Sequence, residues 1–179
     1  ADRFDKAWLA ERLKRAEIPV AALAAVGFYL HSVPVLFVAL ALFGVIGALF
    51  GPIKYGILPD HLETRELPAG NALIEGATFA AILGGTIAGG LAAADPEHAW
   101  LVAMGVVTLA LACWGAAKLI PPTGARAPGL VIDRNPWTST VALIRDLKQD
   151  GRLWIGGLIT SWFWLVGAVA LSLLPAVAK

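Results

Sequence analysis

Five long stretches of this chain are almost free of charged residues, and prolines and glycines separate them. An α-helix rises 1.5 Å per residue and bilayer hydrocarbon is about 30 Å thick, so about 20 apolar residues suffice to cross it. Hydrocarbon offers no partner for an exposed backbone amide, which makes helices the natural spanning elements. The pattern predicts an all-α integral membrane protein with five transmembrane helices, at roughly 18–33, 34–53, 76–94, 99–117 and 153–174.

Composition excludes an ordinary soluble domain. Hydrophobic residues make up 58% of the chain and charged residues 15%, against about 45–50% and about 25% in soluble domains. The first apolar run is short for a crossing. We expect it to gain length from the amphipathic stretch before it, where Lys14 and Arg15 can extend their charged ends toward the interface.

The basic residues predict the orientation of the helices. The two short turns near 31–33 and 95–98 contain no lysine or arginine, whereas the other connections contain many. Because basic residues accumulate on the cytoplasmic side, we expect the N-terminus and the links 54–68 and 118–152 to be cytoplasmic. Every basic residue except Lys179 then lies on that side: Arg3, Lys6, Arg12, Lys14, Arg15, Lys54, Arg65, Lys118, Arg126, Arg134, Arg145, Lys148 and Arg152.

The long link before the last apolar run contains a second kind of helix. Pro121-Pro122 ends the preceding helix, and Asn135-Pro136 provides a cap and a first-turn proline. From Trp137 to Lys148, apolar residues recur at helical spacing among charged ones. This predicts a short amphipathic helix at the cytoplasmic interface. Its apolar face lies against either lipid or the protein's own underside.

The first residues resemble a loop motif of the major facilitator superfamily, Gly-x-Leu-Ala-Asp-Arg-x-Gly-Arg-Lys. Asp2 and Arg3 match this motif, Lys6 matches a trailing basic position, and Asp5 replaces the expected glycine. The resemblance implies that Asp2 and Arg3 are gating residues on the cytoplasmic side. A solvated helix cap is the simpler alternative. The motif starts before Ala1, and the sequence has no signal-peptide pattern, so we expect an internal piece of a longer polypeptide.

The third apolar run resembles another motif of the superfamily, Gly-x8-Gly-x3-Gly-Pro-x2-Gly-Gly. Gly76, Gly85 and Gly89 match it, while Gly90 stands where the motif has proline. Small residues let helix backbones approach closely. We therefore expect these four glycines to form a helix-packing face, whether or not the protein is an antiporter.

The segments 51–60, 66–76 and 161–164 resemble bacterial lysophospholipid transporters, a family within this superfamily. The resemblance implies a partial major facilitator fold containing the third to seventh of twelve helices. Residues 1–120 would belong to the N-terminal half, 121–151 to the inter-half loop and 152–179 to the C-terminal half. It also implies translocation of lyso-phosphatidylethanolamine across the bacterial inner membrane. Many members are fused to an acyltransferase, which is therefore an expected partner, together with membrane lipids and the remaining helices.

Polar groups concentrate where the second and third spanning helices approach the cytoplasmic side. Gly51-Pro52 predicts a kink or an end of the second helix, and an acidic residue in a spanning segment is a functional candidate. We expect Lys54 and Tyr55 to contact an anionic headgroup, and Asn71 and Glu75 to complete the pocket. The alternative is that Lys54 reaches lipid phosphates and satisfies Glu75.

Other functions find less support in the sequence. A carrier of another small molecule or drug would share the glycines and the loop motif. A membrane-bound acyltransferase would need a His-x4-Asp pair, and none of the three histidines has one. A non-catalytic scaffold would leave the polar cluster unexplained. The sequence has no metal-ligand spacing and no phosphate-binding loop, so we expect no enzyme activity in this chain, no cofactor and no nucleic-acid partner.

Overall fold

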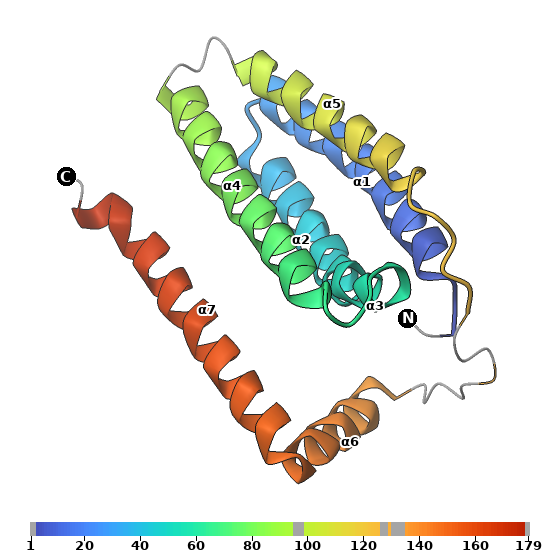
Figure 1. The fold of residues 1–179 in the computed structure, drawn as a ribbon. Helices are drawn as coiled ribbons and strands as arrows, with labels where there is room; N and C mark the ends of the chain where they lie inside the picture. Colours follow the sequence, from blue (N-terminus) through green and yellow to red (C-terminus); the bar gives the residue numbers. More distant parts are fainter. Residues whose placement is uncertain (1–2, 95–98, 126–128, 130–134, 178–179) are drawn as a thin grey trace. The chain divides into compact units, whose positions relative to one another are not determined.

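The computed structural model describes residues 3–94, 99–125, 129 and 135–177, and the regular structure in these residues is entirely helical. This confirms the predicted all-α membrane class. The helices are α1 (Lys6–Tyr29), α2 (Val33–Gly56), α3 (Leu58–His61), α4 (Leu67–Ala94), α5 (Ala99–Ala117), α6 (Pro136–Gln149) and α7 (Gly151–Val177), as Figure 1 shows.

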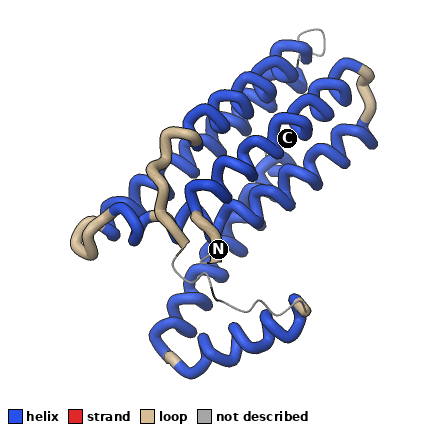
Figure 2. The backbone as a smooth tube through the Cα atoms, turned by 90° about the vertical axis from the view of Figure 1, so that its right-hand side faces the viewer, coloured by secondary structure: helices blue, strands red, loops and turns tan. Residues whose placement is uncertain are grey.

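The chain divides into two compact units, residues 1–130 and 131–179. In the first unit the four long helices α1, α2, α4 and α5 lie side by side (Figures 1 and 2). Helix α1 packs along both α2 and α5, whereas α4 contacts α3 and α5 less extensively. In the second unit α6 contacts α7. Helix α1 is therefore the central element of the first unit.

Within the part of the chain that the structure describes, four helical segments are long and apolar enough to cross a membrane: Val33–His61, Leu67–Gly90, Trp100–Ala117 and Gly151–Val169. The protein is a multi-pass membrane protein. Helix α1 has the same length as α2 but contains several charged residues in its first half. The predicted crossing at 18–33 is the second half of this longer helix and stays a prediction.

The ends of the second and third predicted helices differ from expectation. Helix α2 continues through Pro52 to Gly56, and α3 follows after a single residue. A proline inside a helix removes one backbone hydrogen bond, but neighbouring helices and local adjustments satisfy the freed carbonyl in membrane segments. Helix α4 begins at Leu67 rather than at 76, with Pro68 in its first turn, where the missing N–H is not needed.

The contact between α1 and α2 combines alanines with branched apolar residues. Val20 and Ala24 of α1 form a buried cluster with Ala39 and Ile46 of α2. A Cβ atom added at Gly27 would lie 2.8 Å from Leu36 Cδ2 and 3.2 Å from the Leu36 backbone nitrogen. A larger residue at position 27 would have to displace Leu36, so glycine favours the close approach of the two helices near the turn that joins them.

Replacing Gly27 with valine is expected to push α1 and α2 apart and to lower the free energy of unfolding by about 1–3 kcal/mol, the usual cost of overpacking. The measurement is chemical denaturation of the purified chain in detergent micelles. The matched control is Gly47→Val in α2, because an added Cβ there meets nothing within 4 Å. Equal stability of the two variants would show that Gly27 does not set the spacing.

Candidate functional site

Two side-chain hydrogen bonds join the C-terminal part of α2 to the first half of α4. The Tyr55 hydroxyl donates to Glu75 Oε1, and Lys54 Nζ donates to Thr78 Oγ1 at 3.0 Å. Glu75 and Thr78 are neighbours on one face of α4, so consecutive residues of α2 reach consecutive positions of that face. Three of the four predicted substrate-binding residues therefore lie together in this polar cluster.

The two formal charges of this cluster do not pair with each other. Lys54 bonds a neutral hydroxyl and lies 4.8 Å from the Tyr55 ring centroid, and Glu75 accepts its hydrogen bond from Tyr55. The sequence suggested Lys54 as the partner of Glu75, but no ion pair joins these two described residues. An ammonium and a carboxylate, both partly buried, therefore lie between α2 and α4 without pairing with each other.

Asn71, the fourth predicted binding residue, is oriented differently. Its amide donates to the Leu67 carbonyl one turn earlier in α4, at 2.9 Å, and the residue is exposed. The structure does not bring Asn71 into contact with the other three residues. Its role in binding stays a prediction.

The predicted gating residues lie at the beginning of the chain. Asp2 is outside the described residues. Arg3 is exposed, and its guanidinium lies 5.8 Å from the centroid of the Phe4 ring. The gating role of both residues stays a prediction.

The neighbouring Lys6 makes a contact that sequence reasoning missed. Lys6 Nζ forms an ion pair with Asp60 Oδ2 at 2.9 Å, and the two side chains are only 6% and 4% exposed. The pair joins the start of α1 to α3, which follows the end of α2. The sequence partly indicated a role for Lys6, because Lys6 matched a basic position of the loop motif. The sequence could not identify Asp60 as its partner. The predicted topology brings the start of α1 and the end of α2 to the same side of the membrane, but it does not show which residues of the two ends meet.

Asp5 attaches a third segment to the start of α1. Its carboxylate caps the helix by accepting from the backbone N–H groups of Ala7 and Trp8. It also accepts from the backbone N–H of Gly124 at 2.8 Å and from the Thr123 hydroxyl at 3.2 Å. Burial favours a raised pKa for Asp5, but the hydrogen bonds from Trp8, Gly124 and Thr123 outweigh it and lower the pKa below the ordinary value.

The predicted glycine face of α4 has no partner within the described structure. A Cβ atom added at Gly76, Gly85, Gly89 or Gly90 would meet nothing within 4 Å. Close packing instead occurs at Gly70, where an added Cβ would lie 2.5 Å from Leu62 Cδ1. The packing role of the four predicted glycines stays a prediction.

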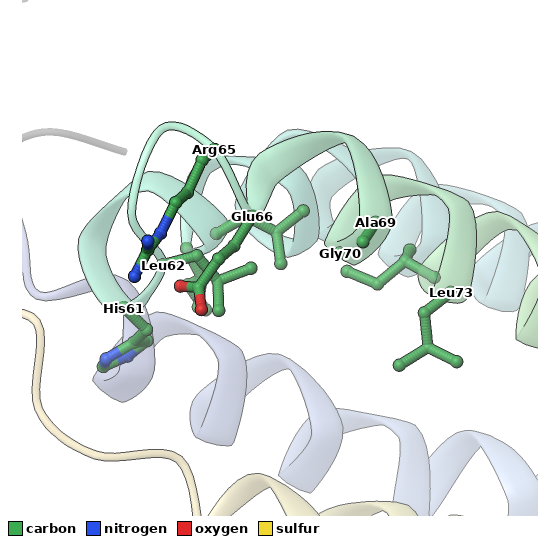
Figure 3. Close-up of a pocket in the computed structure, with 10 residues that line it drawn as sticks. His61, Leu62, Arg65, Glu66, Ala69, Gly70 and Leu73 are labelled. Atoms are coloured by element: carbon green, nitrogen blue, oxygen red, sulfur yellow. The ribbon is translucent and has the colours of Figure 1, made fainter.

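A cavity of about 710 Å³ lies beside the turn that connects α3 to α4. Its walls are mainly apolar and include Leu58, Leu62 and Leu73. Figure 3 shows Arg65, Glu66 and His61 toward one end of the cavity and Leu73 toward the other. Among the described residues, no group of three or more histidine, cysteine or acidic side chains could hold a metal ion.

Comparison with known proteins identifies the family of this chain. The chain is 39% identical over 142 residues to a lysophospholipid transporter of Cronobacter sakazakii, and this match covers 77% of the chain. The corresponding transporters of Pectobacterium carotovorum and Klebsiella pneumoniae are each 35% identical, over 144 and 142 residues, again with 77% of the chain covered. The chain belongs to the family of the bacterial lysophospholipid transporters.

The match has a defined extent. The chain spans about one third (34%) of the length of each of these three relatives. No family model and no solved structure matches the chain. The similarity to these three relatives confirms the predicted family. The assignment of α1, α2, α4, α5 and α7 to the third to seventh helices of a twelve-helix major facilitator fold stays a prediction.

Removing either partner of the buried ion pair is expected to break the contact between the start of α1 and α3. Lys6→Met or Asp60→Leu alone should lower the free energy of unfolding in detergent micelles by about 3–5 kcal/mol. The double variant should recover most of that loss, because an apolar pair avoids the desolvation of both charges. Additive losses in the double variant would show that the two side chains do not interact.

Lowering the pH is expected to weaken the link made by Asp5. Its folded-state pKa lies below the ordinary value of 3.8, so its contribution to stability is present above that value and is lost as the pH falls through the folded-state pKa. The stability difference between wild type and Asp5→Asn should be constant at neutral pH and shrink below about pH 4. The exposed Glu63→Gln provides the control. A difference that persists unchanged at the lowest pH would contradict this assignment.

Proposed function

We propose that this chain is part of a secondary transporter that moves a lysophospholipid across the bacterial inner membrane by alternating access. The observation that carries the proposal is the similarity over 77% of the chain to proteins named lysophospholipid transporters. The polar cluster formed by α2 and α4 supports it independently. Ionisable groups within spanning segments are costly and are retained mainly where they serve a substrate path.

The substrate class follows from the two unpaired charges of the cluster. A lyso-phosphatidylethanolamine headgroup contains a phosphate and an ammonium a few atoms apart. The phosphate would replace Thr78 as the partner of Lys54. The ammonium of the headgroup would form an ion pair with the carboxylate of Glu75. Each exchange replaces a hydrogen bond between one charged group and a neutral hydroxyl with an ion pair between two charged groups. Tyr55 would hold Glu75 in position between these exchanges.

Inner-membrane location and a cytoplasmic N-terminus complete the proposal. The basic residues of the first unit gather near the start of α1, the end of α2 and the end of α5, which are the ends expected to face the cytoplasm. The ion pair of Lys6 with Asp60 and the bonds of Asp5 would then brace the cytoplasmic side. Asp2 and Arg3 directly precede this point, where a gating contact would act.

The expected partners are the lysolipid, the surrounding membrane lipids and the remaining helices of the transporter. An acyltransferase fused to the same polypeptide would consume the transported lysolipid. The chain would act in transport only together with those remaining helices, and we expect no cofactor.

Lys54→Gln and Glu75→Gln in the complete transporter are each expected to slow lysophospholipid uptake into proteoliposomes about tenfold or more. One charge-assisted hydrogen bond contributes about 1.5–3 kcal/mol, and each 1.4 kcal/mol corresponds to a factor of about ten. Uptake at wild-type rates by both variants, with normal insertion, would show that the site lies elsewhere.

Two threonines of α4 provide a matched comparison. Thr78 and Thr86 each donate to a backbone carbonyl four residues earlier, at 2.7 and 2.8 Å, but only Thr78 also accepts from Lys54. Thr78→Val is therefore expected to alter the KM for lysophospholipid, whereas Thr86→Val should leave it unchanged. The same effect from both substitutions would indicate a general response of α4.

A further inference from the structure

Helix α6 has an apolar stripe that no element of its own unit covers completely. Trp137, Val141 and Ile144 lie along one side of the helix and are 76%, 44% and 42% exposed. Ser139 and Asp146 lie on the opposite side. A stripe of this length next to a polar face is typical of helices that lie in the plane of a membrane surface.

The corner between α6 and α7 determines where α6 lies. Asp150 is the only residue between the two helices. Its carboxylate accepts from the backbone N–H groups of Arg152 and Leu153, at 2.9 and 3.4 Å, and so caps α7. Figure 1 shows that α6 does not continue the axis of α7. Since α7 is apolar enough to cross a membrane, a one-residue corner places the end of α6 at the boundary of the hydrocarbon.

Basic residues accompany the stripe at this boundary. Lys148 Nζ lies 5.1 Å from the centroid of the Trp154 ring, which brings a cation and an interfacial aromatic residue together across the corner. Arg145 lies at the edge of the stripe, where it lines a groove of about 400 Å³ together with Trp137 and Val141. An apolar floor with a guanidinium at its side suits an acyl chain and a phosphate of the same lipid.

We propose that α6 is a lipid-binding helix that lies in the headgroup region of the leaflet in which α7 begins, with Trp137, Val141 and Ile144 inserted and Arg145 and Lys148 bound to anionic headgroups. The occupant of the stripe is the bilayer surface. This inference does not depend on the transported substrate. It predicts that α6 anchors the residues before α7 to the membrane surface and responds to anionic lipid content.

The test measures the depth of spin labels in the chain reconstituted into vesicles, with Cys113→Ser as the background. Labels are attached to single cysteines at Val141 and Ile144 on the stripe, and at Ser139 and Asp146 on the opposite face. The stripe labels are expected to be accessible to oxygen and protected from a water-soluble nickel chelate. The opposite labels should show the reverse. Labels at all four positions in water would overturn the proposal.

The same labels distinguish lipid from protein as the occupant. Packing of α6 on the protein's own underside would immobilise the stripe labels and shield them from both oxygen and nickel, and this result would overturn the proposal. The charge is tested in vesicles of phosphatidylethanolamine with and without phosphatidylglycerol. Arg145→Gln and Lys148→Gln should each lower the equilibrium constant for insertion of the α6 stripe, read from its labels, about fivefold in the anionic vesicles. The control Arg65→Gln should leave it unchanged. Insertion independent of phosphatidylglycerol and of both substitutions would refute binding to anionic headgroups.

Discussion

The ion pair between Lys6 and Asp60 connects parts of the chain that are far apart in sequence. Its side chains are almost completely buried, and the adjacent Asp5 bonds Thr123 and Gly124 beyond the end of α5. The start of α1 therefore holds both the turn after α2 and the segment after α5. Because α1 also packs along α2 and α5, the first unit is organised around this one helix and its charged first turn.

Two kinds of charge placement follow from the same helices. Lys6 and Asp60 are buried and neutralise each other, which suits a contact that holds helix ends together. Lys54 and Glu75 are partly buried and instead bond to neutral hydroxyls. A closed ion pair has little to offer a ligand, since its partners would have to be separated first. The unpaired charges of α2 and α4 are available, which is why the proposed substrate site lies there.

The sequence predicted those features that depend on neighbouring residues. Asn135 caps α6 by accepting from Trp137 at 3.0 Å, as the Asn-Pro pair indicated, and the apolar runs became helices. Contacts between helices were harder to predict, because they depend on register. The sequence predicted that Lys54, Tyr55 and Glu75 lie on one side of the membrane. It did not predict that Glu75 bonds Tyr55 rather than Lys54. The close approaches at Gly27 and Gly70 left no sequence signal distinct from the many other glycines.

Several charged residues of α1 have partners on the same or neighbouring helices, which a count of charged residues does not reveal. Lys14 bonds Glu17 at 2.8 Å and lies 4.2 Å from the Phe50 ring centroid, and Arg15 lies 5.9 Å from that of Trp114. Partners of this kind reduce the cost of charge near lipid.

The contacts at the ends of α1 also agree with a crossing. The start of α1 meets α3 after α2 and the residues after α5, so these three ends lie together. Helices α1 and α2 are consecutive, and meeting at this end requires them to run in opposite directions. Five alternating crossings place the start of the first, the end of the second and the end of the fourth on one side of a membrane. These contacts reproduce that arrangement within the first unit without any use of the charge rule. These contacts show which helix ends lie together, and the crossing by α1 stays a prediction.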